Sequence, residues 1–168
     1  MNDIETITDG KLTLVSECSV REFVNNANIY EMAQAYAFRN GPDMFYIGIS
    51  QCAMSRVMGH LSMKDCPRWP DNGKFVDIIN DNAPASLDWQ LQFYKMIPCG
   101  LSRYCDIELS EGYSRSSLCG SCVRREESKV ISRLNPLLNA AGKSGSSSVR
   151  GKYIDRSSRV INITFVQE

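Results

Sequence analysis

The chain has 168 residues, 43% of them hydrophobic, so it is long enough to bury one core, and we expect a single domain over residues 1–168. Nineteen basic and nineteen acidic side chains cancel, so a polyanion would have to meet a local basic face rather than the total charge. No segment reaches the ~20 apolar residues of a membrane span. We therefore expect a cytoplasmic protein with no membrane partner.

The first predicted elements are a helix and a hairpin. Ser19 stands three residues before Glu22, which is a capping-box signature, and apolar residues follow at near-helical spacing, so residues 19–33 predict a helix. Residues 34–50 predict an antiparallel hairpin with strands at 34–40 and 44–50 around the turn sequence NGPD. Tyr36 and Tyr46 would then lie near one another across the hairpin.

A basic amphipathic helix is predicted next, at residues 55–63. Its apolar residues form one stripe, while Arg56 and His60 share a second face because they are four residues apart. Residues 88–96 alternate well enough to be a third strand. The basic pair of the helix is thus expected to point to one place.

The second half of the chain predicts one further helix and a closing strand. Residues 124–134 read as a helix that Pro136 ends, and residues 142–168 as a flexible Gly/Ser/basic loop followed by a strand. Between them, residues 99–122 give mixed signals. The expected fold is α+β, with a small, mostly antiparallel three-stranded sheet flanked by helices, an N-terminal helix and a C-terminal strand.

Several of these residues stand in the order and spacing of a known family. The predicted hairpin ends in Tyr46, Ile47 and Gly48, an arginine follows on a helix at position 56, and a later helix carries Glu127-x3-Ile before Asn-Pro-x2-Asn. This pattern resembles the GIY-YIG nuclease family over residues 34–139. Gln-Ala-Tyr at 34–36 stands where the family has Gly-Ile-Tyr, so only the tyrosine is shared. Residues 99–122 would be a Cys-containing insertion.

The resemblance implies a Mg²⁺- or Mn²⁺-dependent endonuclease of phage or bacterial type that hydrolyses DNA phosphodiester bonds. The location would be the cytoplasm of a bacterial or phage-infected host cell. A second interpretation stays open, because the altered first motif also fits a non-catalytic nucleic-acid or protein-binding module that kept the nuclease fold.

Five residues are candidates for the chemistry. Glu127 could hold Mg²⁺, which prefers oxygen ligands and often takes only one or two from protein. Arg56 could hold two phosphate oxygens in the transition state with its planar guanidinium. The resemblance implies a tyrosine base, for which Tyr36 is the first choice once a nearby cation lowers its pKa, with Tyr46 orienting water or phosphate. His60 matches the helix histidine of many members and could carry a proton or contact phosphate.

Two residues are expected to do structural work at this site. Gly48 would let the backbone pass close to a neighbour or phosphate, or would be a simple bulge glycine. Asn139 fits the terminal asparagine of the family pattern and is expected to hydrogen-bond backbone around the site.

The cysteines and the remaining basic residues allow two readings each. Four thiolates could hold a structural zinc ion or could be ordinary small buried residues; they are Cys99, Cys105, Cys119 and Cys122. Basic residues flanking the site could contact DNA phosphates or could simply be solvated; they are Arg68, Lys74, Arg124, Lys143, Arg150 and Lys152. A single constellation hydrolyses one bond at a time, so concerted double-strand cleavage would require a homo-oligomer.

Overall fold

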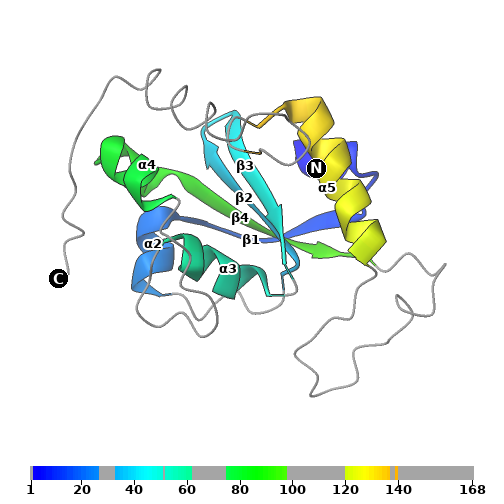
Figure 1. Cartoon of the computed structure of the whole chain (residues 1–168), viewed down its shortest axis with the longest axis horizontal. Helices are drawn as coiled ribbons and strands as arrows, with labels where there is room; N and C mark the ends of the chain where they lie inside the picture. The colour runs from blue at the N-terminus through cyan, green and yellow to red at the C-terminus, as the bar shows by residue number, and fades with distance from the viewer. Residues whose placement is uncertain are drawn as a thin grey trace, which may run out of the picture.

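The computed structural model describes residues 2–26, 33–50, 52–61, 75–97, 120–136 and 139. Its centre is a four-stranded antiparallel sheet with helices on both faces (Figure 1). The strands lie in the order β1-β4-β2-β3 and are β1 (Leu12–Ser19), β2 (Ala35–Asn40), β3 (Asp43–Ile49) and β4 (Gln90–Met96). The helices are α1 (Asp3–Ile7), α2 (Val20–Asn25), α3 (Ala53–His60), α4 (Val76–Asp81), the 3-10 turn η2 (Ala85–Asp88) and α5 (Gly120–Leu134).

The α+β class is confirmed, and the antiparallel sheet has a fourth strand beyond the three predicted. The structure adds β1, which pairs with β4, and places the short helix α1 before it. A capping box starts α1, because the Asn2 side chain accepts from the backbone N–H of Glu5 and the Glu5 side chain accepts from that of Asn2. The N-terminal segment is therefore part of the core sheet rather than an addition to it.

The predicted hairpin is confirmed. Strands β2 and β3 pair in antiparallel register, with Tyr36 opposite Gly48 and Phe38 opposite Tyr46. The turn between them uses Gly41, whose φ of 59° lies in the left-handed region that glycine adopts without strain. Strand β4 pairs with β2 on its other side, so the strand that carries Tyr36 lies inside the sheet.

Two hydrophobic clusters lie on the two faces of the sheet. The first joins side chains of β2, β3 and β4 to helices α2, α3 and α4, and contains Tyr36, Phe38 and Phe93. The second lies under α1 and α5 and contains Tyr94 and Val130. Neighbouring residues of a strand point to opposite faces, which explains why Phe93 and Tyr94 belong to different clusters. Helices α3 and α5 consequently pack on opposite faces of the sheet (Figure 1).

Side chains satisfy outer backbone N–H groups in the first half of the edge strand β1. On β1, the backbone N–H groups of Leu12 and Leu14 donate to the Thr8 hydroxyl at 3.2 Å and the Glu5 carboxylate at 2.8 Å. Both acceptors belong to the α1 segment, so this segment covers the first half of the edge. Covered edges resist pairing with a second chain.

Several element boundaries differ from the predicted ones. Helix α2 starts where the capping box predicts, with Ser19 as N-cap, but ends at Asn25. Helix α3 begins two residues earlier than predicted, and α5 begins at Gly120, inside the predicted insertion 99–122. Strand β4 starts at Gln90, because Asp88 belongs to η2. The rest of the insertion and the loop and strand predicted at 142–168 lie outside the described residues.

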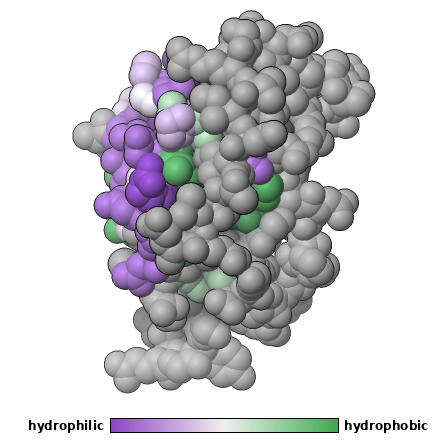
Figure 2. Space-filling model, turned by 90° about the vertical axis from the view of Figure 1, so that its left-hand side faces the viewer, coloured by the Kyte–Doolittle hydropathy of each residue, from purple (hydrophilic) through white to green (hydrophobic). Residues whose placement is uncertain are grey.

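The described surface is mostly polar. Figure 2, which faces the side of the molecule where α2 and α4 lie, shows mainly hydrophilic described residues with small apolar areas between them. Within the described ranges, the large hydrophobic side chains that remain exposed are Val15 and Ile97. The described helices include none that is long and apolar enough to cross a membrane.

Candidate active site

The hydroxyl of Tyr36 is the centre of the candidate site. Tyr36 lies in the middle of the sheet on β2 and is 1% exposed, and its hydroxyl oxygen lies 2.8 Å from Nε2 of His60 on α3. The side chains of Tyr46 and Arg56 are also within hydrogen-bonding reach of this hydroxyl. The structure therefore brings together four of the five residues that the sequence nominates for chemistry.

The helix α3 supplies two of these side chains, as its spacing predicts. Arg56 and His60 are one turn apart, and both meet the Tyr36 hydroxyl. His60 is only 1% exposed, whereas Arg56 is half-buried. Arg56 and His60 thus point to one place, as their helical spacing predicts, and aromatic rings cover His60 there.

Aromatic packing fixes the orientation of the rings at the site. Tyr36 and Tyr46 have centroids 5.9 Å apart, and each lies within 6 Å of the His60 ring. Phe75, at the start of α4, packs edge-on against His60 at 4.6 Å and against Tyr46 at 4.8 Å. Phe75 is fully buried, so the His60 and Tyr46 rings pack against a side chain that the core holds in place.

Gly48 makes room for the two tyrosines. A Cβ at this position would lie 2.5 Å from Cζ and from the hydroxyl oxygen of Tyr36, and 2.9 Å from Cε1 of Tyr46. These separations are shorter than any side-chain carbon tolerates, so a side chain at 48 would push the rings aside. Of the two readings, close approach rather than a simple bulge explains this glycine.

The Asn139 side chain pairs with the backbone on the outer edge of β3, as a neighbouring strand would. Its side-chain amide accepts a hydrogen bond from the backbone N–H of Ile47 at 2.8 Å and donates one to the backbone carbonyl of Ile47 at 2.6 Å. These are the backbone hydrogen bonds that the sequence predicts, and Asn139 is buried to make them. The two bonds hold the strand at Ile47, between Tyr46 and Gly48.

The pKa of Tyr36 moves in the direction opposite to that expected of a base. Burial, together with the neighbouring Tyr46, raises the pKa of Tyr36 well above its usual value near 10. Arg56 opposes this shift but only in part. Tyr36 is consequently a protonated phenol at neutral pH, and the expectation that Arg56 makes it an ionised base is not met in this arrangement.

Glu127 lies apart from the tyrosine group. It is half-buried on α5, on the helix that packs against β3 from the other face of the sheet, and makes no hydrogen bond to Tyr36, Tyr46 or His60 among the described residues. Burial raises the pKa of the Glu127 carboxyl, and the nearby Arg124 guanidinium lowers it in part. A cation would favour the ionised form of this carboxyl.

The described residues fit a magnesium ion that takes few of its ligands from the protein. Within the described ranges no group of three or more His, Cys, Asp or Glu side chains is close enough to form a metal cage. Mg²⁺ often binds through one or two carboxylates and fills its other positions with water and phosphate oxygens. Glu127 can serve as such a single protein ligand.

The zinc and DNA candidates are described only in part. Cys122 is a buried cysteine in the second cluster, while Cys99, Cys105 and Cys119 lie outside the described residues. Arg124 is exposed on α5. The other residues predicted to contact DNA, namely Arg68, Lys74, Lys143, Arg150 and Lys152, also lie outside the described part of the chain.

Two residues near the candidate site, Phe75 and Glu126, are not predicted from the motifs of the sequence. Phe75 opens the apolar run FVDII, but its sequence position gives no sign that it packs on His60. Glu126 follows Val123 by three residues and precedes Val130 by four, which places it on the buried face of α5 by helical periodicity. That periodicity could have identified Glu126 as a buried carboxylate.

Comparison with family models, with curated proteins and with solved structures finds no match to this chain.

Proposed function

We propose that this protein is a Mg²⁺-dependent endonuclease that hydrolyses DNA phosphodiester bonds with a GIY-YIG-like site. The single observation that carries the proposal is the convergence of Tyr46, Arg56 and His60 on the buried hydroxyl of Tyr36. Two independent features support it. Gly48 has no space for a side chain, and Asn139 holds the backbone of the same strand.

Arg56 is the residue that meets the phosphate. It is half-buried, so part of its guanidinium is accessible, and contact with Tyr36 fixes the other part. A planar guanidinium can donate two hydrogen bonds to the equatorial oxygens on which charge grows during hydrolysis. Its positive charge is worth most for the transition state, where that negative charge is largest.

The proton from the attacking water leaves through a relay. Tyr46 is half-buried and is the tyrosine nearer to solvent, whereas Tyr36 is inaccessible, so water meets Tyr46 first. The Tyr46 hydroxyl passes its proton to Tyr36 as it takes one from water, and Tyr36 passes its own to Nε2 of His60 in the tautomer that leaves this nitrogen unprotonated. This route replaces a free phenolate at Tyr36, which the raised pKa of that residue disfavours.

The water oxygen attacks phosphorus while the bond to the 3′ oxygen breaks. A magnesium ion at Glu127 would supply positive charge for the leaving oxygen. Every other step uses side chains of the Tyr36 group. Residues of this group thus bind phosphate and move the proton, and Glu127, on the helix α5 that packs against the edge strand β3, would hold the metal.

Plasmid cleavage tests the proposal against the binding-module interpretation. Purified protein with supercoiled plasmid and Mg²⁺ should convert the plasmid to nicked product, and EDTA should stop the reaction. Glu127→Gln keeps the shape of the side chain and removes the charge, so it should lose cleavage while retaining its melting temperature. A wild-type protein that binds plasmid but leaves it supercoiled would favour the binding module instead.

His60→Gln separates the relay from a purely structural role of the histidine. Glutamine can still hydrogen-bond the Tyr36 hydroxyl but cannot hold the proton, so kcat should fall while KM stays within about twofold. If His60→Gln cleaves at the wild-type rate, the proton leaves by another route.

A further inference from the structure

A fully buried carboxylate on α5 gathers three cations at the surface. Glu126 has an exposed fraction of 0%, and its carboxylate oxygens lie 3.6 Å from Nζ of Lys11, 3.2 Å from Nε of Arg125 and 3.0 Å from Nζ of Lys129. We call these four residues the Glu126 cluster. Lys11 is the residue directly before β1, so its ion pair with Glu126 also connects α5 to the sheet.

The Glu126 cluster carries more positive charge than its single carboxylate neutralises. One carboxylate faces three cations, so the four side chains carry a net charge of +2 on a chain whose total charge is zero. The cationic side chains remain 36–49% exposed, while the carboxylate that holds them in place is hidden. Like charges held this close repel one another, and an arriving anion relieves that repulsion.

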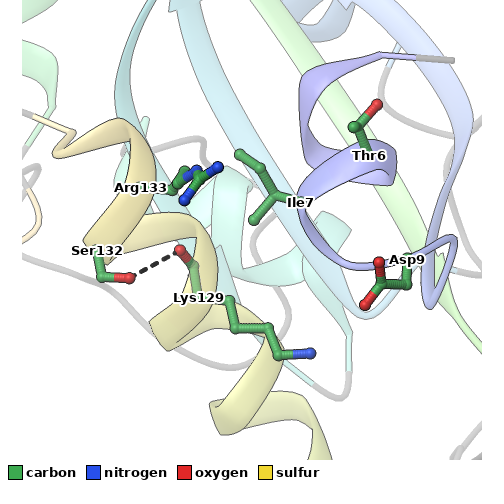
Figure 3. A pocket seen from close by; sticks show the side chains of 6 residues that line it. All are labelled: Thr6, Ile7, Asp9, Lys129, Ser132 and Arg133. Atoms are coloured by element: carbon green, nitrogen blue, oxygen red, sulfur yellow. Dashed lines mark hydrogen bonds between the residues drawn. The ribbon is translucent and has the colours of Figure 1, made fainter.

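An open cleft continues the cluster between α5 and α1. It has a volume of about 400 Å³ and is lined by Thr6, Ile7, Asp9, Lys129, Ser132 and Arg133. Figure 3 shows the Arg133 side chain extending from α5 towards Ile7 across the gap, with Lys129 on the side nearer Asp9. Two cations thus line the α5 wall of the cleft, and one carboxylate lies on the α1 wall.

We propose that the Glu126 cluster and the adjoining cleft bind the phosphate backbone of duplex DNA. The charge complementarity argues for a polyanion, and the exposed cations Arg125, Lys129 and Arg133 lie at positions i, i+4 and i+8, which places them in one row along α5. A row of cations along a helix can meet successive phosphates of one strand. This row lies on the face of the sheet opposite Tyr36 but on the helix that carries Glu127, so it adjoins the proposed metal ligand, and the choice of duplex DNA as its ligand rests on the proposed function.

Equilibrium binding in EDTA tests this surface without requiring cleavage. Fluorescence anisotropy of a labelled 20-base-pair duplex, measured over a series of salt concentrations, gives both Kd and the slope of log K against log salt. Each lost phosphate contact lowers the slope by about 0.9. The double variant Arg125→Gln/Arg133→Gln should therefore lose about one to two units of slope and bind roughly ten- to a hundredfold more weakly near 0.1 M salt.

Two single variants fix the sign and the location of the effect. Asp9→Asn removes the carboxylate from the cleft and should strengthen binding by about twofold, opposite to the loss of the arginines. Arg21→Gln is the matched control. Arg21 is exposed on α2, does not line the cleft, and pairs with Asp88 at a distance of 3.8 Å. It should leave the slope unchanged.

The outcomes separate this surface from the proposed catalytic site. Unchanged affinity and slope in the double variant, or an equal loss in Arg21→Gln, would overturn the proposal. Competition by polyglutamate as strong as that by duplex, at equal charge, would also overturn it, because the surface would then accept any polyanion. A wild-type protein that binds duplex with the expected salt slope but does not cleave it would count against the nuclease proposal alone.

Discussion

Replacing Gly48 by alanine is the sharpest perturbation of the site that the structure offers. The added Cβ would lie 2.5 Å from Cζ of Tyr36 and 2.9 Å from Cε1 of Tyr46. Ordinary van der Waals contact between carbons needs a separation of about 3.5–4.0 Å, so the Tyr36 ring would have to move by about 1 Å. It cannot move freely, because it is 1% exposed and its hydroxyl is bonded to His60.

The expected cost follows from overpacking. Added methyl groups in a well-packed core cost about 1–3 kcal/mol, and the rigid Tyr36 ring places Gly48 at the upper end of that range. Alanine also recovers about 0.5–1 kcal/mol of the backbone entropy that glycine loses in a strand. The net loss is about 2 kcal/mol, which lowers the melting temperature of a chain of this size by about 4–8 °C.

A double-mutant cycle isolates the clash. Thermal unfolding is measured for the wild type, Gly48→Ala, Tyr36→Leu and the double variant. The cost of Gly48→Ala should fall clearly once Tyr36 is leucine, because the two closest atoms, Cζ and the hydroxyl oxygen of Tyr36, are then gone and only Cε1 of Tyr46 at 2.9 Å remains. Equal costs of Gly48→Ala in both backgrounds, or a Gly48→Ala protein as stable as the wild type, would refute the close approach.

Three further predictions concern the residues around this core. Asn139→Ala removes both hydrogen bonds to the backbone of Ile47 and should lower the free energy of unfolding by about 1–3 kcal/mol, measured by urea denaturation, whereas an unchanged value would show that the edge of β3 does not need them. The backbone N–H of Leu14 holds the pKa of Glu5 below its ordinary 4.5, so the stability that this bond contributes is present above pH 4.5 and is lost as the pH falls through the lower folded pKa. Glu5→Gln should therefore flatten the fall in melting temperature below that pH, and an identical fall would contradict this linkage. Because the pKa of Tyr36 is raised, Tyr36→Phe should give the same tyrosinate absorbance change as the wild type up to about pH 10.5; a smaller change would mean that Tyr36 ionises normally.

Local signals explain which parts of the fold the sequence predicts. The hairpin forms between segments joined by the turn at Gly41, so alternation and turn chemistry were enough to predict its strands and the closeness of Tyr36 to Tyr46. The start of α2 was predicted for the same reason, because Ser19 and Glu22 form their capping box within one turn.

Long-range contacts explain what the sequence did not predict. A bulge between Leu14 and Ser16 interrupts strand β1, and its partner β4 lies far along the chain, so its alternation alone is too weak a signal. The burial of His60 depends on Phe75, which is likewise distant in sequence. The shared face with Arg56 follows from the helical repeat, but what covers that face is set by tertiary packing.

The same distinction applies to the carboxylates of α5. Motif spacing nominates Glu127, whereas the structure gives its neighbour Glu126 the ion pairs and the complete burial. Adjacent positions on a helix face directions about 100° apart, so the two side chains have different surroundings despite their adjacency. Sequence spacing can nominate a functional carboxylate, but it cannot say which of two neighbours the core requires.

The most direct test of the central claim is the initial rate of loss of supercoiled plasmid for Arg56→Ala in Mg²⁺. The matched control is Arg21→Ala, which removes an exposed arginine of α2 that pairs with Asp88. The account predicts that Arg56→Ala loses at least about a thousandfold in rate, as expected for a transition-state arginine, with its melting temperature within a few degrees of wild type. Arg21→Ala should cleave normally. A folded Arg56→Ala protein that nicks plasmid at the wild-type rate would contradict the account.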